Sequence, residues 1–283
     1  MRLGYTTNGL THHSLPAAIE LLAALGYRSV SISLDHACLN PYGEQFQREL
    51  GETAELLAKH DMGSVVETGA RFLLDPWVKH EPTLISPDET DRLRRIDFLR
   101  RAIDAAAALN SDCMSLWSGV VRHSAGRDVA WAHLASGLRR VLDDAERCDV
   151  KLGFEPEPDM LVDTMAALEE LLDRVDSPHL GLTLDVGHLH CQGETPIAAV
   201  IRRWAPRLVN VHIEDMRAGV HEHLMFGEGE IEFPPVIAVL AELGYDGGVH
   251  VELSRHSHDG PNAARHAFTF LHPLIVGATR RGA

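Results

Sequence analysis

One short stretch of the chain carries six side chains that can bind a metal ion or move a proton. The segment VNVHIEDMRAGVHEHLMFGEGEI, residues 209–231, contains His212, Glu214, Asp215, His221, Glu222 and His223. It begins with an aliphatic run, so the polar side chains stand where a buried strand would end. Histidine-rich loops occur without any chemistry, but imidazoles and carboxylates at this density are also typical of metal sites. The elements that position these residues decide between the two interpretations.

Short apolar runs alternate along the chain with longer helical patterns. Eight β-branched or aliphatic runs predict strands at 2–6, 29–34, 64–67, 112–117, 151–155, 180–185, 208–213 and 248–253. Helical patterns fill the intervals, as between Pro16 and Gly26, two residues typical of a helix start and a helix end. This rhythm predicts a (β/α)8 TIM barrel with one domain over residues 1–283. The alternative, a doubly wound open sheet, lacks a GxGxxG turn after the first strand.

Side-chain alternation separates two faces in the last four of these strands. Aliphatic residues share one face, and small or polar residues share the other. Each polar face ends in one strong ligand: Glu155, Asp185, His212 and Glu252. Three carboxylates in one lumen would raise one another's pKa unless a positive charge lay between them. The pattern favours a divalent cation over pairing with arginine or lysine, and the mostly oxygen set suits Mn, Mg or Co, with Zn and Fe as alternatives.

Further candidates lie near the expected mouth of the barrel. Most of the 18 histidines fall in or just beyond the C-terminal ends of the predicted strands, where barrel enzymes carry their active sites. Segment 68–90 is long for a strand-to-helix loop and contains Arg71, Lys79 and His80. We expect this loop to close over a substrate rather than to form an oligomer contact. Trp117 either forms another wall of the pocket or packs in the core.

Composition limits the partners and the compartment. A net charge of -15 argues against nucleic acid, because binding phosphates requires clusters of lysine and arginine. No apolar stretch approaches the roughly 20 residues of a membrane span, and the N-terminus leads directly into a predicted strand without a secretion signal. Four cysteines without a CxxC pair indicate free thiols in a reducing cytoplasm. We therefore expect a cytoplasmic protein that acts on a small molecule, and a homo-oligomer is compatible with these properties.

Four motifs carry a family resemblance. The motifs are GFEPEP, LDVGHLH, VHIED followed by FGEGEIEFPPVI, and VHVELS, within residues 150–254. They resemble the xylose isomerase-like superfamily of metal-dependent barrels, which includes sugar isomerases, sugar epimerases and the endonuclease IV enzymes. The resemblance implies that Glu155, Asp185, His212 and Glu252 are metal ligands, as in the epimerase-like members. The first half of the chain matches the superfamily only through its strand rhythm.

The same resemblance suggests roles for residues around the ligand set. His188 matches a residue that contacts substrate or a further metal, and Arg217 corresponds to a substrate-binding arginine, one residue closer to His212 than in the family pattern. His221 and His223 occupy the positions of an Asp-x-His pair that binds an additional metal in the endonuclease IV group. Early-barrel histidines of that group have no match here. We therefore expect one metal ion, with His188, His221 and His223 as substrate contacts.

The resemblance implies an enzyme of carbohydrate metabolism. It would be an isomerase or epimerase of a sugar, a sugar phosphate or a polyol-derived ketone, in which the metal stabilises an enediolate while Glu155 and Glu252 remove and return a proton. Glu157 would orient a substrate hydroxyl, or else be a solvated loop acid. A lyase acting on a keto-cyclitol or keto-acid would begin with the same proton abstraction, and a metal hydrolase is a third reading. A non-catalytic sugar-binding barrel would need neither a metal nor paired acids.

Overall fold

Eight parallel strands close into a barrel in the computed structural model, which describes residues 1–122 and 126–282. The strands are β1 (Arg2–Thr6), β2 (Ser29–Ser33), β3 (Gly63–Glu67), β4 (Met114–Leu116), β5 (Leu152–Phe154), β6 (Leu180–Asp185), β7 (Leu208–Ile213) and β10 (Gly248–Val251). Pairing of β1 with both β2 and β10 closes the barrel. The predicted (β/α)8 fold is therefore confirmed, and all eight predicted strands overlap the observed ones.

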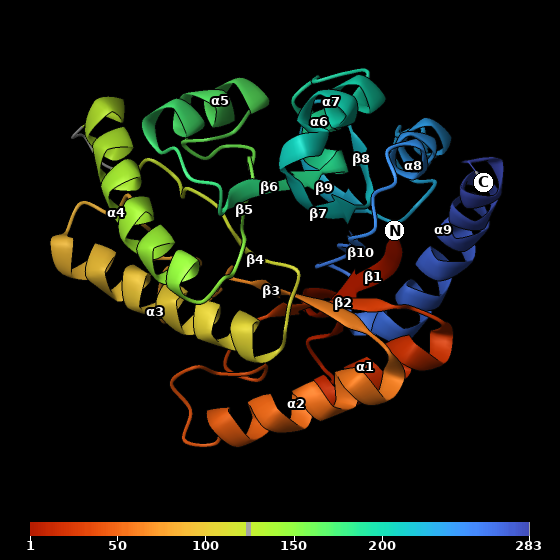
Figure 1. Ribbon diagram of the computed structural model, residues 1–283, viewed down its shortest axis with the longest axis horizontal. Helices are drawn as coiled ribbons and strands as arrows, with labels where there is room; N and C mark the ends of the chain where they lie inside the picture. The colour runs from red at the N-terminus through yellow and green to blue at the C-terminus, as the bar shows by residue number, and fades with distance from the viewer. Residues whose placement is uncertain (123–125, 283) are drawn as a thin grey trace.

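Helices surround the barrel on all sides (Figure 1). They are α1 (Leu15–Leu25), α2 (Phe46–His60), α3 (Glu89–Ala108), α4 (Arg127–Arg147), α5 (Met165–Arg174), α6 (Val186–Cys191), α7 (Ile197–Trp204), α8 (Phe233–Glu242) and α9 (Gly260–Gly282). The described residues also form the 3-10 turns η1 (Thr7–Leu10), η2 (Ala205–Arg207) and η3 (Ser257–Asp259). No helix within the described parts of the chain is long and apolar enough to cross a membrane.

Two helix termini show how local sequence positions the fold. Helix α1 ends at Gly26, whose φ of 103° is the left-handed conformation that favours glycine at a helix end. Helix α6 begins directly after β6, because the Asp185 carboxylate accepts a hydrogen bond of 2.7 Å from the His188 backbone N–H. Asp185 therefore ends a barrel strand and caps the next helix, which places His188 beside it at the mouth of the barrel.

The histidine-rich stretch forms a hairpin that the sequence analysis did not predict. After β7 the chain forms β8 (Asp215–Arg217) and β9 (Val220–Leu224), which pair as a separate antiparallel sheet. The Asp215 carboxylate then accepts hydrogen bonds from the backbone N–H groups of Gly227, Gly229 and Ile231 at 2.9 to 3.1 Å. Asp215 thus fixes the turn after the hairpin, a structural role that explains one of the six polar residues in this stretch.

The lower part of the lumen contains a buried polar layer that is fully hydrogen-bonded at its centre. His250 contacts Ser29 Oγ through Nε2 and Asn210 Oδ1 through Nδ1, each at 2.8 Å. Because both ring nitrogens have partners, the imidazole is fixed in place. Gly4 packs against this ring so closely that an added Cβ would lie 2.3 Å from His250 Cδ2. The layer therefore closes the barrel below the mouth.

We predict that Gly4→Ala destabilises the protein by about 1–3 kcal/mol, because the hydrogen-bonded His250 ring has no room to move away from a new methyl group. Urea unfolding followed by circular dichroism measures the effect. The matched control is Gly51→Ala in α2, where an added Cβ meets no atom within 4 Å and helix propensity predicts a gain of about 0.5–1 kcal/mol. Equal stability of Gly4→Ala and the unmodified protein would contradict this account of the lumen.

Candidate functional site

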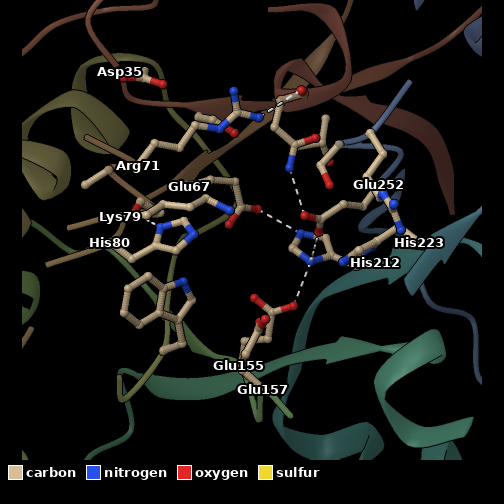
Figure 2. A pocket seen from close by; sticks show the side chains of 18 of the residues that line it. Asp35, Glu67, Arg71, Lys79, His80, Glu155, Glu157, His212, His223 and Glu252 are labelled. Carbon is tan, nitrogen blue, oxygen red and sulfur yellow. Dashed lines mark hydrogen bonds and ion pairs between the residues drawn. The ribbon is translucent and has the colours of Figure 1, made fainter. Parts of the chain in front are cut away.

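A cavity of about 450 Å³ opens at the C-terminal ends of the strands. Side chains from opposite sides of the barrel line it, and Figure 2 shows them pointing into a common space. The lining includes Asn8, Glu67, Arg71, Lys79, His80, Trp117, Glu155, Glu157, His212, His221, His223 and Glu252. The cavity therefore lies where the sequence analysis expected an active site.

The four side chains expected at the ends of the last strands meet at one point below this cavity. His212 Nδ1 lies 2.9 Å from Glu155 Oε1, 3.1 Å from Glu252 Oε2 and 3.9 Å from Asp185 Oδ2. One donor atom from each of these four residues lies within 4.8 Å of all the others. Strand alternation thus identified the cluster correctly, because the four strands present these residues to the same lumen.

Burial and neighbouring charges have opposite effects on the pKa values of this cluster. Burial raises the pKa of Glu155 to about 7 even though His212 lowers it. Burial also opposes ionisation of Asp185, but the neighbouring imidazoles of His188 and His212 outweigh it and lower the pKa of that carboxyl. The pKa of His212 is well above its usual range, because Glu155 and Glu67 overcome the cost of burying the imidazolium. One imidazole is thus the main positive partner of several buried carboxylates.

Glu67, which the sequence analysis did not place in the site, holds the other side of His212. This residue ends β3, is 8 % exposed, and accepts hydrogen bonds from Ser31 Oγ at 2.5 Å and from His212 Nε2 at 2.9 Å. Because Nε2 donates to Glu67, Nδ1 is the nitrogen that faces the other carboxylates. Glu67 could have been identified from the sequence in the same way as Glu155, because each is a carboxylate at the end of a predicted strand.

The donor set fits a divalent cation. Three carboxylates and one imidazole nitrogen surround a common point, a combination that suits Mn, Mg, Co or Zn. Asp185 Oδ2 is buried and has no hydrogen-bond partner among the residues that the structure describes. A buried carboxylate oxygen without a donor is costly unless a cation is its partner. The residues present therefore meet the chemical requirements of a metal centre.

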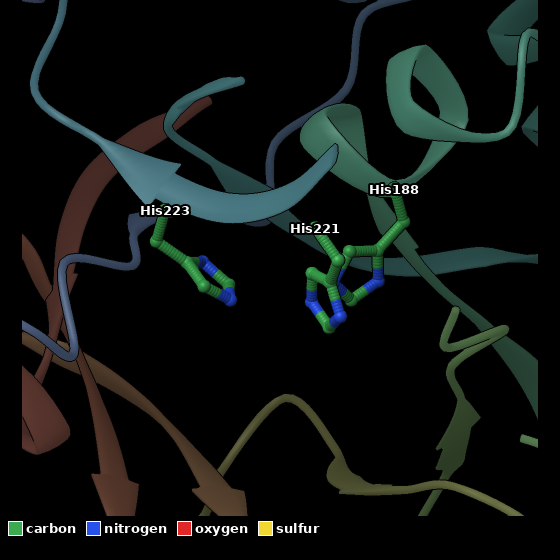
Figure 3. A group of neighbouring side chains, drawn as sticks. All are labelled: His188, His221 and His223. Carbon is green, nitrogen blue, oxygen red and sulfur yellow. The ribbon is translucent and has the colours of Figure 1, made fainter. Parts of the chain in front are cut away.

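Three histidines form a second group beside this cluster (Figure 3). His188 comes from α6 and His221 and His223 from β9, with ring centroids 4.8 to 5.9 Å apart. His188 Nδ1 donates to the Pro156 carbonyl at 3.1 Å, which leaves Nε2 as an acceptor. Burial lowers the pKa of His188 to about 3, whereas Glu214 and Glu252 overcome burial and raise that of His223 to about 10. The group thus offers both an acceptor and a charged donor.

Two glutamates surround these histidines. Glu157 lines the cavity with its oxygens 3.9 Å from His188 Nε2 and 3.6 Å from His221 Nε2, and burial together with Glu155 raises its pKa well above the usual range. Its side chain is 20% exposed and faces the cavity, a position compatible with the expected contact to a substrate hydroxyl. Glu214 is fully buried, 3.8 Å from His223 Nδ1. Burial and the charge of Asp185 raise the pKa of Glu214 well above its usual range.

The remaining predicted site residues divide between the cavity and the surface. Arg71, Lys79 and His80 line the cavity. Trp117 also lines it while its ring packs 4.7 Å from the guanidinium of Arg95, so this tryptophan is both a pocket wall and part of the core. Arg217 differs from expectation: it is exposed on β8, donates to the Glu228 carbonyl at 3.3 Å, and is absent from the cavity lining.

Three curated relatives show similarity over different shares of the chain. An uncharacterized protein of Methanocaldococcus jannaschii is 30% identical over 59% of this chain and 59% of its own length. The L-ribulose-5-phosphate 3-epimerase of Salmonella paratyphi C is 24% identical over 90% of this chain and 89% of the enzyme. An inosose dehydratase of Lacticaseibacillus casei is 30% identical over 44% of this chain and 47% of the enzyme. The chain thus spans less than two thirds of the first and third proteins.

Solved structures confirm the fold and a family model identifies the family. A D-tagatose 3-epimerase-like protein superimposes with a TM-score of 0.80 at 23% identity over the full length of both chains. An IOLI protein with a bound zinc atom superimposes with a TM-score of 0.77 at 18% identity, covering 98% of this chain and 99% of that protein. The model described as xylose isomerase-like TIM barrel matches residues 19–274. The chain belongs to the xylose isomerase-like TIM barrel family.

Proposed function

We propose that this protein is a divalent-metal-dependent isomerase or epimerase of a sugar, a sugar phosphate or a polyol-derived ketone. The observation that carries this proposal is the pair Glu155 and Glu252, whose carboxylates approach His212 Nδ1 from two different strands at the base of an open cavity. Two carboxylates placed around one point suit a reaction in which a proton leaves one carbon and returns to the same or a neighbouring carbon.

Glu155, Asp185, His212 and Glu252 would hold the metal ion. A cation bound there would polarise the substrate carbonyl and acidify the adjacent carbon-bound proton. The mostly oxygen donor set favours manganese, magnesium or cobalt, and the zinc atom of the IOLI structure supports zinc as an alternative. The relative named L-ribulose-5-phosphate 3-epimerase supports a ketose substrate, since it covers most of the chain.

The protein side chains supply the proton transfer. Glu155 accepts the proton from the substrate carbon as the general base. Glu252 returns the proton, with its other oxygen held by Asn8 Nδ2 at 2.8 Å. His188 Nε2 accepts a hydrogen bond from a substrate hydroxyl, while His221 and His223 contact neighbouring hydroxyls. Glu157 orients a further hydroxyl, and Trp117 forms a wall of the pocket.

A lyase reaction is the second candidate, supported by the relative named inosose dehydratase. It begins with the same proton abstraction and then expels hydroxide. The test incubates metal-loaded protein in heavy water with ketoses, keto-acids and inososes. Deuterium bound to carbon in an epimerised or isomerised product supports the proposed function, whereas a dehydrated product establishes the lyase. Absence of both exchange and dehydration across the panel would refute proton-transfer chemistry.

The cysteines support a reducing compartment for this reaction. Cys38, Cys113, Cys148 and Cys191 are all free thiols. Disulfides are rare in the cytoplasm, where thiols are kept reduced. We therefore place the reaction in the cytoplasm, as part of carbohydrate metabolism.

We predict that Glu155→Gln and Glu252→Gln each lower kcat by at least about 10²–10⁴-fold, the contribution typical of acid-base catalysis, because each residue is both a ligand and a proton-transfer group. Product formation and deuterium incorporation measure the loss, and circular dichroism checks that the fold is kept. Near-normal turnover in either variant would disprove the two-glutamate mechanism.

A second prediction concerns Glu67, which contacts His212 on the side away from the proposed metal. Glu67→Leu should weaken Mn binding to the metal-free protein by about 10–100-fold, the usual effect of losing such an orienting contact. Glu67→Gln keeps an acceptor for His212 Nε2 and should retain more affinity than Glu67→Leu. Calorimetric titration measures both variants without reference to turnover. Identical affinities in the leucine variant and the unmodified protein would remove Glu67 from this role.

We predict that removing the metal inactivates and destabilises the protein. Chelation should abolish activity and lower the melting temperature, because a ligand that binds only the folded state stabilises it, and Mn, Co or Mg should restore both. Metal analysis of protein purified without a histidine tag should find one ion per chain. Two or more ions, with one lost in the His221→Ala/His223→Ala double variant, would overturn the single-metal expectation and favour the hydrolase alternative. An unchanged melting temperature after chelation would argue against a metal at the cluster.

A further inference from the structure

The cavity has an acidic side and a basic side. Figure 2 shows Arg71, Lys79 and His80 together on one side, with Glu252 across the pocket. Arg71, Lys79 and His80 all belong to the loop between β3 and α3. A substrate whose carbonyl group reaches the carboxylate cluster has its other end in the cavity. Arg71 and Lys79 border that part of the cavity.

Neither cation on this side is neutralised by a carboxylate. Among the residues described, no Asp or Glu lies within ion-pair distance of Arg71 or Lys79. Asp35 is the acid on the same wall, and its Oδ1 accepts the His36 backbone N–H at 2.7 Å. In a chain with 41 acidic and 26 basic residues, two unpaired cations facing one cavity indicate that a negative charge has its place there.

Arg255 provides an internal comparison at the same cavity. It also lines the pocket, but its guanidinium forms an ion pair with Glu222, another lining residue. The arginine on the hairpin side of the mouth is therefore neutralised by the protein itself. The arginine and lysine on the β3–α3 loop are not, so their side of the pocket retains its positive charge.

His80 lies among these cations as a neutral imidazole. Its Nδ1 donates to the Gly69 carbonyl at 2.6 Å, and burial, followed by the charges of Lys79, Arg95 and Arg71, lowers its pKa to about 4. Arg95 lies behind this wall, 1 % exposed, and donates to the Thr68 carbonyl at 2.6 Å. His80 is thus a neutral hydrogen-bond acceptor beside three cations. It can accept a hydrogen bond from a substrate hydroxyl that lies next to an anionic group of the same substrate.

The loop holds Arg71 in a defined orientation. Arg71 itself has a φ of 29°, and its neighbour Ala70 has a φ of 55°, conformations that non-glycine residues rarely adopt. The Arg71 guanidinium donates through Nη2 to the Asn8 carbonyl at 3.0 Å. Its other N–H groups have no hydrogen-bond acceptor among the described residues and can bind a ligand. Asn8 also donates to Glu252. Asn8 in η1 therefore contacts both Arg71 and Glu252, and it fixes the spacing between them.

We propose that Arg71 and Lys79 form an anion subsite for the end of the substrate remote from its carbonyl, so that the enzyme acts on phosphorylated or carboxylated ketones rather than on neutral sugars. This inference rests on the proposed function for its reaction, although the binding that it describes can be measured without turnover. Arg71 offers a planar fork that matches phosphate and carboxylate oxygens, and Lys79 adds a second positive charge.

The test compares matched substrates that differ only in the anionic group. Metal-loaded protein is assayed with D-ribulose and D-xylulose against their 5-phosphates, and with D-fructose against D-fructuronate for the carboxylate. We expect the unmodified protein to have a higher kcat/KM for one anionic series than for the matching neutral sugars. Arg71→Gln and Lys79→Met should each lower kcat/KM for that anionic series, and this decrease should exceed the decrease for the neutral sugars by about 10- to 100-fold. The series that shows this differential loss distinguishes phosphate from carboxylate.

Lys59→Met is the matched control, because Lys59 lies on the exposed face of α2 and should keep the original substrate ratio. A wild-type preference for neutral sugars, or equal losses for both series in the Arg71 and Lys79 variants, would overturn the subsite. If no ketone is turned over, the proposed function fails separately, and calorimetry with the same ligand pairs decides the subsite. Tighter binding of the anionic ketone that is lost in Arg71→Gln supports it, and equal binding of the two ligands rejects it.

Discussion

The enclosure of several carboxylates in one barrel lumen is the constraint on which the rest of this site depends. Glu67, Glu155, Asp185 and Glu252 all lie within reach of the single imidazole of His212. Charges that approach this closely away from water interact strongly, and their burial is costly unless each has a partner. The chain meets the constraint with a histidine bonded on both sides, and with a donor set suited to a divalent cation.

Several elements position the side chains of this cluster through hydrogen bonds. Below it, His250 and Asn210 connect β10 and β7 in a layer whose hydrogen bonds end at the oxygen of Glu67. Beside it, Asp185 caps α6 and so brings His188 to the mouth. Above it, Asp215 fixes the turn that follows β9. Side chains that appear to be one dense polar stretch in the sequence therefore have separate roles, some in the fold and some in the proposed chemistry.

The sequence predicted the parts of this arrangement that depend on local periodicity. Alternation along β5, β6, β7 and β10 placed Glu155, Asp185, His212 and Glu252 on one face, because the direction of a strand side chain follows from its position alone. The contact of Glu67 with His212 joins residues 145 positions apart, and that of Asn8 with Glu252 joins residues 244 apart. Such contacts depend on how the closed barrel brings β3 opposite β7 and η1 beside the end of β10, which periodicity does not specify. The β8–β9 hairpin was missed because its polar sequence resembles a loop.

The two contacts of Asn8 affect how the substrate specificity of this site can change by mutation. Its side chain donates to Glu252 and its carbonyl accepts from Arg71, so a single residue touches both the acid-base machinery and the loop that borders the far end of the pocket. A replacement at either end is transmitted to the other through η1, and the effects of paired changes will not be additive. Changes of specificity that combine a substitution of Glu252 with one of Arg71 should therefore show epistasis, because both residues are held by Asn8.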